Sequence, residues 1–468
     1  MDHHGTESQK PHTDSAAMAR RGGGMVMDHD RMMREEHERT LWTHFSNMTL
    51  GAWLIASPVS FGYQSTAVGR SDIVTGGLIV ILSALSISPE RGWPRWANCF
   101  AGIWLLFAPL VFWAPTAAAY TNDTLIGALV IAFAILVPGM PGMSMEAMMS
   151  GPDVPPGWTY NPSSWLQRAP LIGLAIVSFL LSRYLTAHQL GYIQQAWDPF
   201  FGDGTRRVLN SEVSRAWPIS DAGLGALTYV LEALSGFMGD RRRWRTMPWM
   251  VLMFFVLVVP LGITSIVLVM LQPVAVGTWC TICLATAALM LIMIPLAVDE
   301  VVAMGQFLAQ IRREGKPLWT TFWRGGTLEG NEGDLRTPDF HAPLGQTVPA
   351  TAWGVTAPWT LLVSAALGIW MLVAPAVLQI QGAAANSSYI AGALITTFAV
   401  LAMAEVTRAA RFLNLLVALW VLASPWILAG ATAEGRWNGV AVGILLVIAS
   451  LPRGKVKERY GHWDAWVV

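Results

Sequence analysis

The sequence predicts an all-α polytopic membrane protein with about twelve transmembrane helices, arranged as a central four-helix bundle between two four-helix repeat units. Of its 468 residues, 54% are hydrophobic and only 13% are charged, whereas soluble domains carry about a quarter charged residues. The 23 Trp and 43 Gly are typical of membrane interfaces and of close helix contacts. The net charge of zero and the lack of a long basic tract argue against a nucleic-acid partner.

Apolar segments long enough to cross a bilayer recur along the chain, at about 17–25 residues each. The predicted spans are 46–63, 72–88, 96–114, 123–138, 168–188, 221–238, 248–271, 279–298, 358–379, 388–405, 412–430 and 437–451. Arg and Lys gather on one side of these spans, as in Arg241–Arg245 and the tail 453–468. Because positive loops stay in the cytoplasm, we expect both termini to be cytoplasmic and Cys280 and Cys283 to lie near the outer face of the inner (plasma) membrane.

Four segments repeat a Trp and a Pro five residues apart. They are Trp53/Pro58, Trp104/Pro109, Trp370/Pro375 and Trp420/Pro425. Each copy predicts a helical hairpin whose first helix is kinked near its outer end by the proline. The pattern resembles the SPW-repeat membrane family, whose Ser-Pro-Trp sequence is intact at Ser424-Pro425-Trp426. Packing and kinking are favoured over a ligand site as the role of these residues.

The repeats divide the chain into parts. We expect a polar cytoplasmic tail (1–45), a repeat domain (46–140), a linker (141–164), a four-helix domain (165–300), a cytoplasmic linker (301–357), a second repeat domain (358–452) and a cytoplasmic tail (453–468). The acidic pair Asp299-Glu300 is interpreted as a solvated helix end. The repeats leave open whether the protein forms a homo-oligomer.

The four-helix domain holds two of the three cysteines, in Trp279-Cys280-Thr281-Ile282-Cys283. Thiols at i and i+3 at a helix start can close a disulfide, and the unpaired amides there stabilise a thiolate. A pair of this kind at a membrane edge indicates electron transfer between protein dithiols and a lipid-soluble carrier. Cys280 is expected to be the more exposed thiol and Cys283, one turn deeper, the one that meets the carrier. Simple packing of two small residues is the alternative.

The same domain resembles the vitamin K epoxide reductase family through Gly277–Thr286, Val208–Ser211, Pro218–Asp221 and Gly223–Tyr229. The resemblance implies catalytic Cys280 and Cys283, a quinone cofactor of ubiquinone or menaquinone type beside Asp221, Tyr229 and Trp279, and an extracytoplasmic thioredoxin-like partner.

The sequence departs from the family at three places. The loop 189–220 lacks the family's shuttle cysteines, Ala287 replaces a tyrosine, and Asp221 stands where an asparagine is common. Asp221 could donate to a quinone carbonyl when protonated, or simply cap its helix. The third cysteine, Cys99, lies near the opposite membrane face and cannot replace the shuttle pair.

Three functions remain open. The preferred one is a thiol–quinone oxidoreductase, and the second is a non-catalytic scaffold with a degenerate bundle. The third is metal handling by His and Met residues, because thioether and imidazole groups suit Cu(I). These residues are His3, His4, His12, His29, His37, His44, Met25, Met27, Met32, Met33, Met140, Met143, Met145, Met148 and Met149. Their spacing defines no dedicated metal site.

Overall fold

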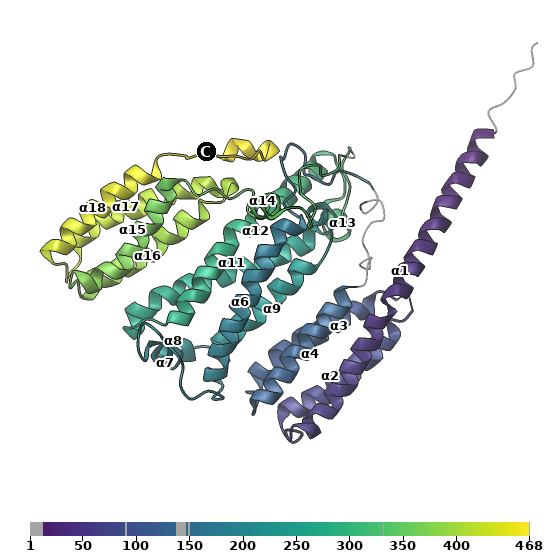
Figure 1. Ribbon diagram of the computed structural model, residues 1–468, viewed down its shortest axis with the longest axis horizontal. Helices are drawn as coiled ribbons and strands as arrows, with labels where there is room; N and C mark the ends of the chain where they lie inside the picture. Colours follow the sequence, from purple (N-terminus) through teal and green to yellow (C-terminus); the bar gives the residue numbers. More distant parts are fainter. Residues whose placement is uncertain (1–12, 89–90, 137–146, 148–149, 331, 468) are drawn as a thin grey trace, which may run out of the picture. The chain divides into compact units, whose positions relative to one another are not determined.

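The computed structural model describes the chain except for residues 1–12, 89–90, 137–146, 148–149, 331 and 468 (Figure 1). In this described part the chain is helical, and β-structure is confined to the isolated bridges Trp158–Tyr460 and Val355–Ala404. The predicted all-α fold class is confirmed. The chain forms two compact units, one of Met1–Ser65, Gly69–Leu105 and Leu125–Pro141 and one of the remaining residues.

The first repeat domain consists of α1 (Thr13–Ser60), α2 (Ala67–Leu85), α3 (Trp93–Val111) and α4 (Ala117–Ile135). Its core is a buried cluster of apolar side chains from all four helices: Leu54, Ile79, Leu105, Ile126 and Val130. Helix α1 extends far into the predicted polar tail, since no proline interrupts the sequence between Pro11 and Pro58. At the crossing of α1 and α2, a Cβ on Gly51 would come 2.7 Å from the Gly76 carbonyl oxygen, so these glycines allow direct backbone contact.

The central bundle consists of α6 (Trp165–Gln189), α9 (Asp221–Phe237), α11 (Pro248–Leu271) and α12 (Thr281–Arg313). Its core is a cluster of buried apolar side chains: Leu171, Ala175, Tyr229, Ala233, Phe254, Val258, Met290, Met293 and Ala297. The short helices α7 (Gly204–Leu209) and α8 (Glu212–Arg215) lie in the connection between α6 and α9, and α10 (Arg243–Thr246) precedes α11. The expected continuation of the fourth helix beyond residue 300 is confirmed, because α12 runs to Arg313.

The second repeat domain contains α15 (Trp359–Val377), α16 (Gly382–Leu401), α17 (Leu413–Ile427) and α18 (Ala433–Ser450), beside the central bundle in Figure 1. The repeated tryptophans connect its hairpins. Trp420 Nε1 donates to Ser387 Oγ at 2.9 Å, and Trp370 Nε1 donates to Asn438 Oδ1 at 2.8 Å. In the first repeat domain Trp104 Nε1 donates to Ser71 Oγ at 2.9 Å. These bonds match the packing role expected for the tryptophans.

Eight helices of the described part are long and apolar enough to cross a membrane. The predicted number of about twelve is therefore not confirmed, although each predicted span overlaps a helix of the described part. Helix α9 has only 17 residues. Helices α1, α3 and α18 carry Trp, Asn and Gly in their apolar stretches, which lowers their mean hydropathy. The orientation of the spans stays a prediction.

The end of the bundle away from the cysteines is a buried polar interface, and here the interpretation of Asp299-Glu300 as solvated is wrong. Their exposed fractions are 3% and 6%. Tyr160 donates to Asp299, and Arg243 donates to both oxygens of Glu300 at 2.6 Å. They are buried because the linkers, which include α13 (Leu318–Arg324) and α14 (Leu344–Ala350), the turn η2 (Glu405–Phe412) and the C-terminal turn η3 (Gly461–Trp466) cover this end of the bundle.

Candidate active site

The two cysteines of the central bundle are bonded to each other at the start of α12. Cys280 and Cys283 form a disulfide with their Cα atoms 5.2 Å apart. Cys280 is the N-cap residue of α12, and its Sγ accepts the backbone N–H of Cys283 at 3.1 Å. The chain reaches this position through the short π-helix η1 (Gln272–Val276), which is followed by Gly277 with φ 73°. Gln272 Oε1 then accepts the Cys280 N–H at 2.8 Å, which fixes the entry into the helix.

Cys280 is fully buried, with an exposed fraction of 0%, whereas Cys283 is partly exposed. The expectation that Cys280 is the more accessible thiol is therefore wrong for this oxidised form. The reason is the segment 198–205, which consists of the loop before α7 and the first two residues of that helix. Thr205 Oγ1 donates to Cys280 Sγ at 3.5 Å, and a Cβ on Gly204 would come 2.1 Å from the Trp279 carbonyl oxygen. The loop thus lies directly against the residue that precedes the disulfide.

Asp198 holds this loop against α12. Its carboxylate accepts the Thr205 N–H at 2.9 Å and hydroxyl at 2.7 Å, and the Thr281 N–H at 3.3 Å and hydroxyl at 2.5 Å. Burial acts to raise the pKa of Asp198, but hydrogen bonds from Thr281, Thr205 and the amides of Phe201 and Phe200 lower it well below its usual range. The ionised Asp198 therefore connects the loop to the first turn of α12, where the helix dipole also favours a negative charge.

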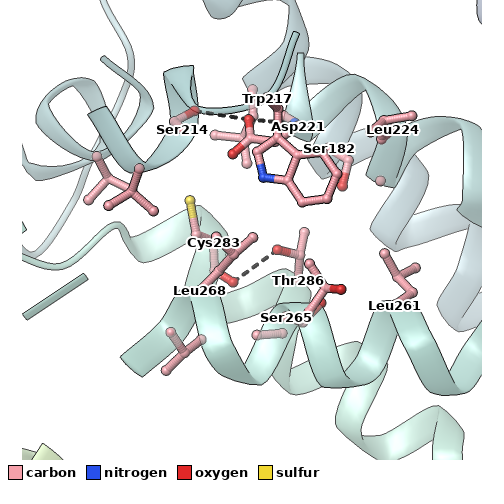
Figure 2. Close-up of a pocket in the computed structure, with 18 of the residues that line it drawn as sticks. Ser182, Ser214, Trp217, Asp221, Leu224, Leu261, Ser265, Leu268, Cys283 and Thr286 are labelled. Atoms are coloured by element: carbon pink, nitrogen blue, oxygen red, sulfur yellow. Dashed lines mark hydrogen bonds between the residues drawn. The ribbon is translucent and has the colours of Figure 1, made fainter. Parts of the chain in front are cut away.

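A cavity of about 360 Å³ opens beside Cys283, between α6, α9, α11 and α12 (Figure 2). Its size lies within the range of small-molecule sites. Helix α11 contributes an apolar wall that includes Leu257, Leu261 and Leu268. Val256, on the same wall, is 56% exposed, so the wall is open at this side chain.

Polar groups of the cavity converge near the disulfide. Asp221 Oδ1 accepts from Gln189 Nε2 at 2.5 Å and from Ser214 Oγ at 3.0 Å, the second bond being drawn in Figure 2. Asp221 is the first residue of α9, and its neighbour Ser220 is the N-cap, accepting the Gly223 N–H. The capping role considered for Asp221 thus belongs to Ser220, and Asp221 is available to the cavity.

The predicted site residues do not all meet at the cavity. Cys283, Asp221 and Tyr229 line it, whereas Trp279 lies outside its lining and packs edge-on against Tyr389 of α16, with ring centroids 5.7 Å apart. Ala287, where the family carries a tyrosine, also lines the cavity.

Two features of the site were missed by sequence reasoning. Trp217 lines the cavity (Figure 2), and Asp198 holds the loop. The sequence Asp198-Pro199 followed by Gly202 and Gly204 is typical of a tight Asp-stabilised turn and could have indicated Asp198. No comparable signal marked Trp217, because it lies in a loop whose course depends on the tertiary fold.

Many of the His and Met residues considered for metal handling lie outside the part of the chain that the structure describes. Eight of them fall outside the described residues: His3, His4, His12, Met140, Met143, Met145, Met148 and Met149. Within the described residues, no group of three or more His, Cys, Asp or Glu is placed to hold a metal ion.

The fold and site define a polytopic membrane protein with a redox-capable cysteine pair beside an apolar cavity. Comparison with family models identifies its parts. Residues 169–298 match the Vitamin K epoxide reductase family, and residues 41–137 and 358–452 match the SPW repeat domain. The chain therefore carries a vitamin K epoxide reductase domain flanked by two SPW repeat domains. No curated protein and no solved structure matches it.

Proposed function

We propose that the protein is a membrane thiol–quinone oxidoreductase that passes electrons from an extracytoplasmic dithiol to a membrane quinone. The observation that carries this proposal is that Cys283, bonded to Cys280, lines an apolar cavity inside the four-helix bundle. The match to the Vitamin K epoxide reductase family supports the same class of reaction. The cavity also argues against the alternative of an inert scaffold, which predicts a filled bundle.

The residues of the cavity fit a quinone. Its apolar walls suit a ring with an aliphatic tail, and the Tyr229 hydroxyl, or Asp221 when protonated, can donate to a ring oxygen. A bound quinone supplies an acceptor for two electrons and two protons.

Cys280 and Cys283 have different roles in the proposed cycle. A thioredoxin-like dithiol in the outer compartment reduces the disulfide by thiol exchange, through a mixed disulfide with Cys280. The partner leaves as a disulfide, and the protein holds two thiols. Cys283 then faces the cavity as its thiolate, aided by the α12 N-terminus, and closing the Cys280–Cys283 bond releases two electrons and two protons. With no cysteine in the loop 189–220, the partner must act on the pair directly.

The loop that covers Cys280 controls this exchange. Thr205 contacts the Cys280 sulfur, and Asp198 holds the loop in place. A partner thiol can reach Cys280 only when this loop moves away. The vitamin K epoxide reductase family carries shuttle cysteines in this loop. Here the loop has no cysteine and instead covers Cys280, and it opens to admit the partner.

Quinone-dependent oxidation of a dithiol substrate in membranes tests the proposal. Membranes containing the protein should oxidise the dithiol only when a short-chain quinone is added, and Cys280→Ala and Cys283→Ala variants should lose this activity. Equal quinone-dependent oxidation by Cys283→Ala membranes would exclude the proposed mechanism.

A further inference from the structure

The central bundle contains a buried acid that the proposed cycle does not use. Glu232 lies on α9 with an exposed fraction of 1%. Among the described residues, neither of its carboxyl oxygens has a hydrogen-bond partner. An ionised carboxylate without a partner is very costly in such a place, and ionisable groups inside a membrane bundle generally serve transport or proton transfer. Glu232 is therefore expected to be protonated at rest.

Glu232 lies next to the cavity along the helix. Tyr229, which lines the cavity, is three residues earlier on α9, so the two side chains share a face of the helix. Opposite them runs α6. A Cβ on Gly225 would lie 3.6 Å from Ser182 Oγ, and one on Gly236 would lie 2.5 Å from Ile172.

This register places Ser178 of α6 opposite Tyr229. The Ser178 side chain is buried, and its hydroxyl also lacks a partner among the described residues. Tyr229 thus lies between the cavity and Glu232 along α9, and Ser178 faces this part of the helix from α6.

Polar groups continue from Glu232 toward the end of the bundle opposite the cysteine pair. Ser235 Oγ donates to the Glu232 carbonyl oxygen at 2.9 Å, and Arg243 donates to the Ser235 carbonyl oxygen at 2.9 Å. Arg243 pairs with Glu300, to which Ser163 also donates. Polar groups therefore lie between Glu232 and the Arg243–Glu300 pair at the opposite end of the bundle, and main-chain carbonyl oxygens connect them.

We propose that Glu232 delivers a proton to the cavity and regains it from the membrane face opposite the cysteine pair. The inference rests on the proposed function. Closing Cys280–Cys283 releases two electrons and two thiol protons, and quinone reduction consumes two of each. One consumed proton comes from Glu232, whose neighbour on the helix face, Tyr229, lines the cavity, while one thiol proton leaves on the cysteine side. Each turnover thus moves one positive charge across the membrane toward the cysteine side.

Proteoliposomes with a trapped pH indicator test this assignment. An impermeant dithiol protein added outside selects the molecules whose cysteines face outward, and valinomycin with potassium prevents charge build-up. We expect the lumen to become alkaline by one proton for each quinone reduced. Glu232→Gln should abolish this uptake and slow turnover by about 10²-fold or more, as for loss of a proton-transfer group, while Glu232→Asp should retain uptake. Glu434→Gln, which changes an exposed acid of α18, is the matched control.

Two outcomes separate this inference from the proposed function. Turnover without lumenal alkalinisation in the unaltered protein would overturn the role of Glu232 alone. Absence of quinone-dependent turnover would overturn both.

Infrared spectra of the resting protein without quinone give an independent readout. A band of a protonated carboxyl group should be lost in Glu232→Gln and kept in Glu434→Gln. An unchanged band in Glu232→Gln, in protein with the normal melting temperature, would contradict the assignment.

Discussion

At the residue scale, Asp198 is the side chain that decides how accessible the disulfide is. It joins the loop before α7 to the first turn of α12 through hydrogen bonds to a carboxylate, each of which contributes about 1.5–3 kcal/mol. Removing it should therefore favour the open loop without touching the cysteines themselves.

Asp198→Ala should expose Cys280 in the reduced protein. Loss of one such bond corresponds to about a tenfold change in the open fraction, so the rate of Cys280 alkylation by a maleimide should rise at least about tenfold. Alkylation of Cys99, followed in the same sample by mass spectrometry, serves as the control. An unchanged rate at Cys280 would show that Asp198 does not hold the cover.

The pH dependence of the same cover follows from the lowered pKa of Asp198. A lowered folded-state pKa means that the ionised carboxyl stabilises the closed loop above the unfolded value of about 3.9. This stabilisation is lost as the pH falls toward the folded-state value. Hydrogen exchange of the 198–205 amides should therefore show unchanged protection from pH 8 to 5 and weaker protection in strong acid. Loss of protection already near pH 6 would contradict the assignment.

Substitutions of one glycine, Gly225, can test whether the cavity holds the quinone. Gly225 lines the cavity, and a Cβ there would make only ordinary contacts, the nearest at 3.6 Å. Gly225→Ala should thus behave as the unaltered protein, whereas Gly225→Phe should fill the cavity. We expect Gly225→Phe to raise the KM for quinone at least about tenfold, a loss of about 1.4 kcal/mol, while the dithiol still reduces the disulfide at the normal rate. Equal KM values for both variants would place the quinone elsewhere.

At the element scale, the two repeat domains differ in how they satisfy a buried asparagine. In the first domain Asn98 Nδ2 donates to Ser83 Oγ at 3.1 Å. The Trp104–Ser71 and Trp420–Ser387 bonds occupy equivalent positions in the two domains. When the domains are aligned on these bonds, Asn414 is equivalent to Asn98 and Ala399 is equivalent to Ser83. Asn414 is fully buried, and neither its amide oxygen nor its nitrogen has a partner among the described residues.

Restoring the missing hydroxyl should stabilise the second repeat domain. We expect Ala399→Ser to raise the free energy of unfolding by about 0.5–1.5 kcal/mol, the contribution of one hydrogen bond. The reciprocal variant Ser83→Ala should lower it by about 1–3 kcal/mol, because it leaves the Asn98 amide unpaired. Thermal unfolding in detergent measures both. A lower melting temperature for Ala399→Ser would refute the alignment.

Helices were also the part of the structure that the sequence predicted best. Apolar length and the Trp–Pro spacing are local properties, so every predicted span overlaps a helix of the described part. The cover over Cys280 and the burial of Asp299 and Glu300 depend on segments distant in sequence, such as the loop at Asp198 and the residues Tyr160 and Arg243. Local sequence patterns do not indicate contacts between distant segments. For this reason the expected exposure of Cys280 and the expected solvation of Asp299 and Glu300 were both wrong.

At the scale of the whole molecule, the Arg243–Glu300 pair supports the interface between the bundle and the linkers. Both side chains are nearly fully buried. Arg243→Met should destabilise the protein by about 3–5 kcal/mol, because it leaves Glu300 buried and unpaired. The double variant Arg243→Met/Glu300→Leu should recover much of this loss. Melting temperatures of the three proteins test the coupling, and additive losses in the double variant would contradict it.

The central claim is that the Cys280–Cys283 pair reduces a quinone held beside Cys283. Its most direct test is a single turnover, in which reduced protein freed of reductant is mixed with quinone while quinol and remaining thiols are both measured. The account predicts that one quinol forms for each cysteine pair oxidised. Cys99→Ala should give the same yield of quinol, and Cys283→Ala should form no quinol. Thiol loss without quinol, or quinol formed by Cys283→Ala at the normal rate, would contradict it.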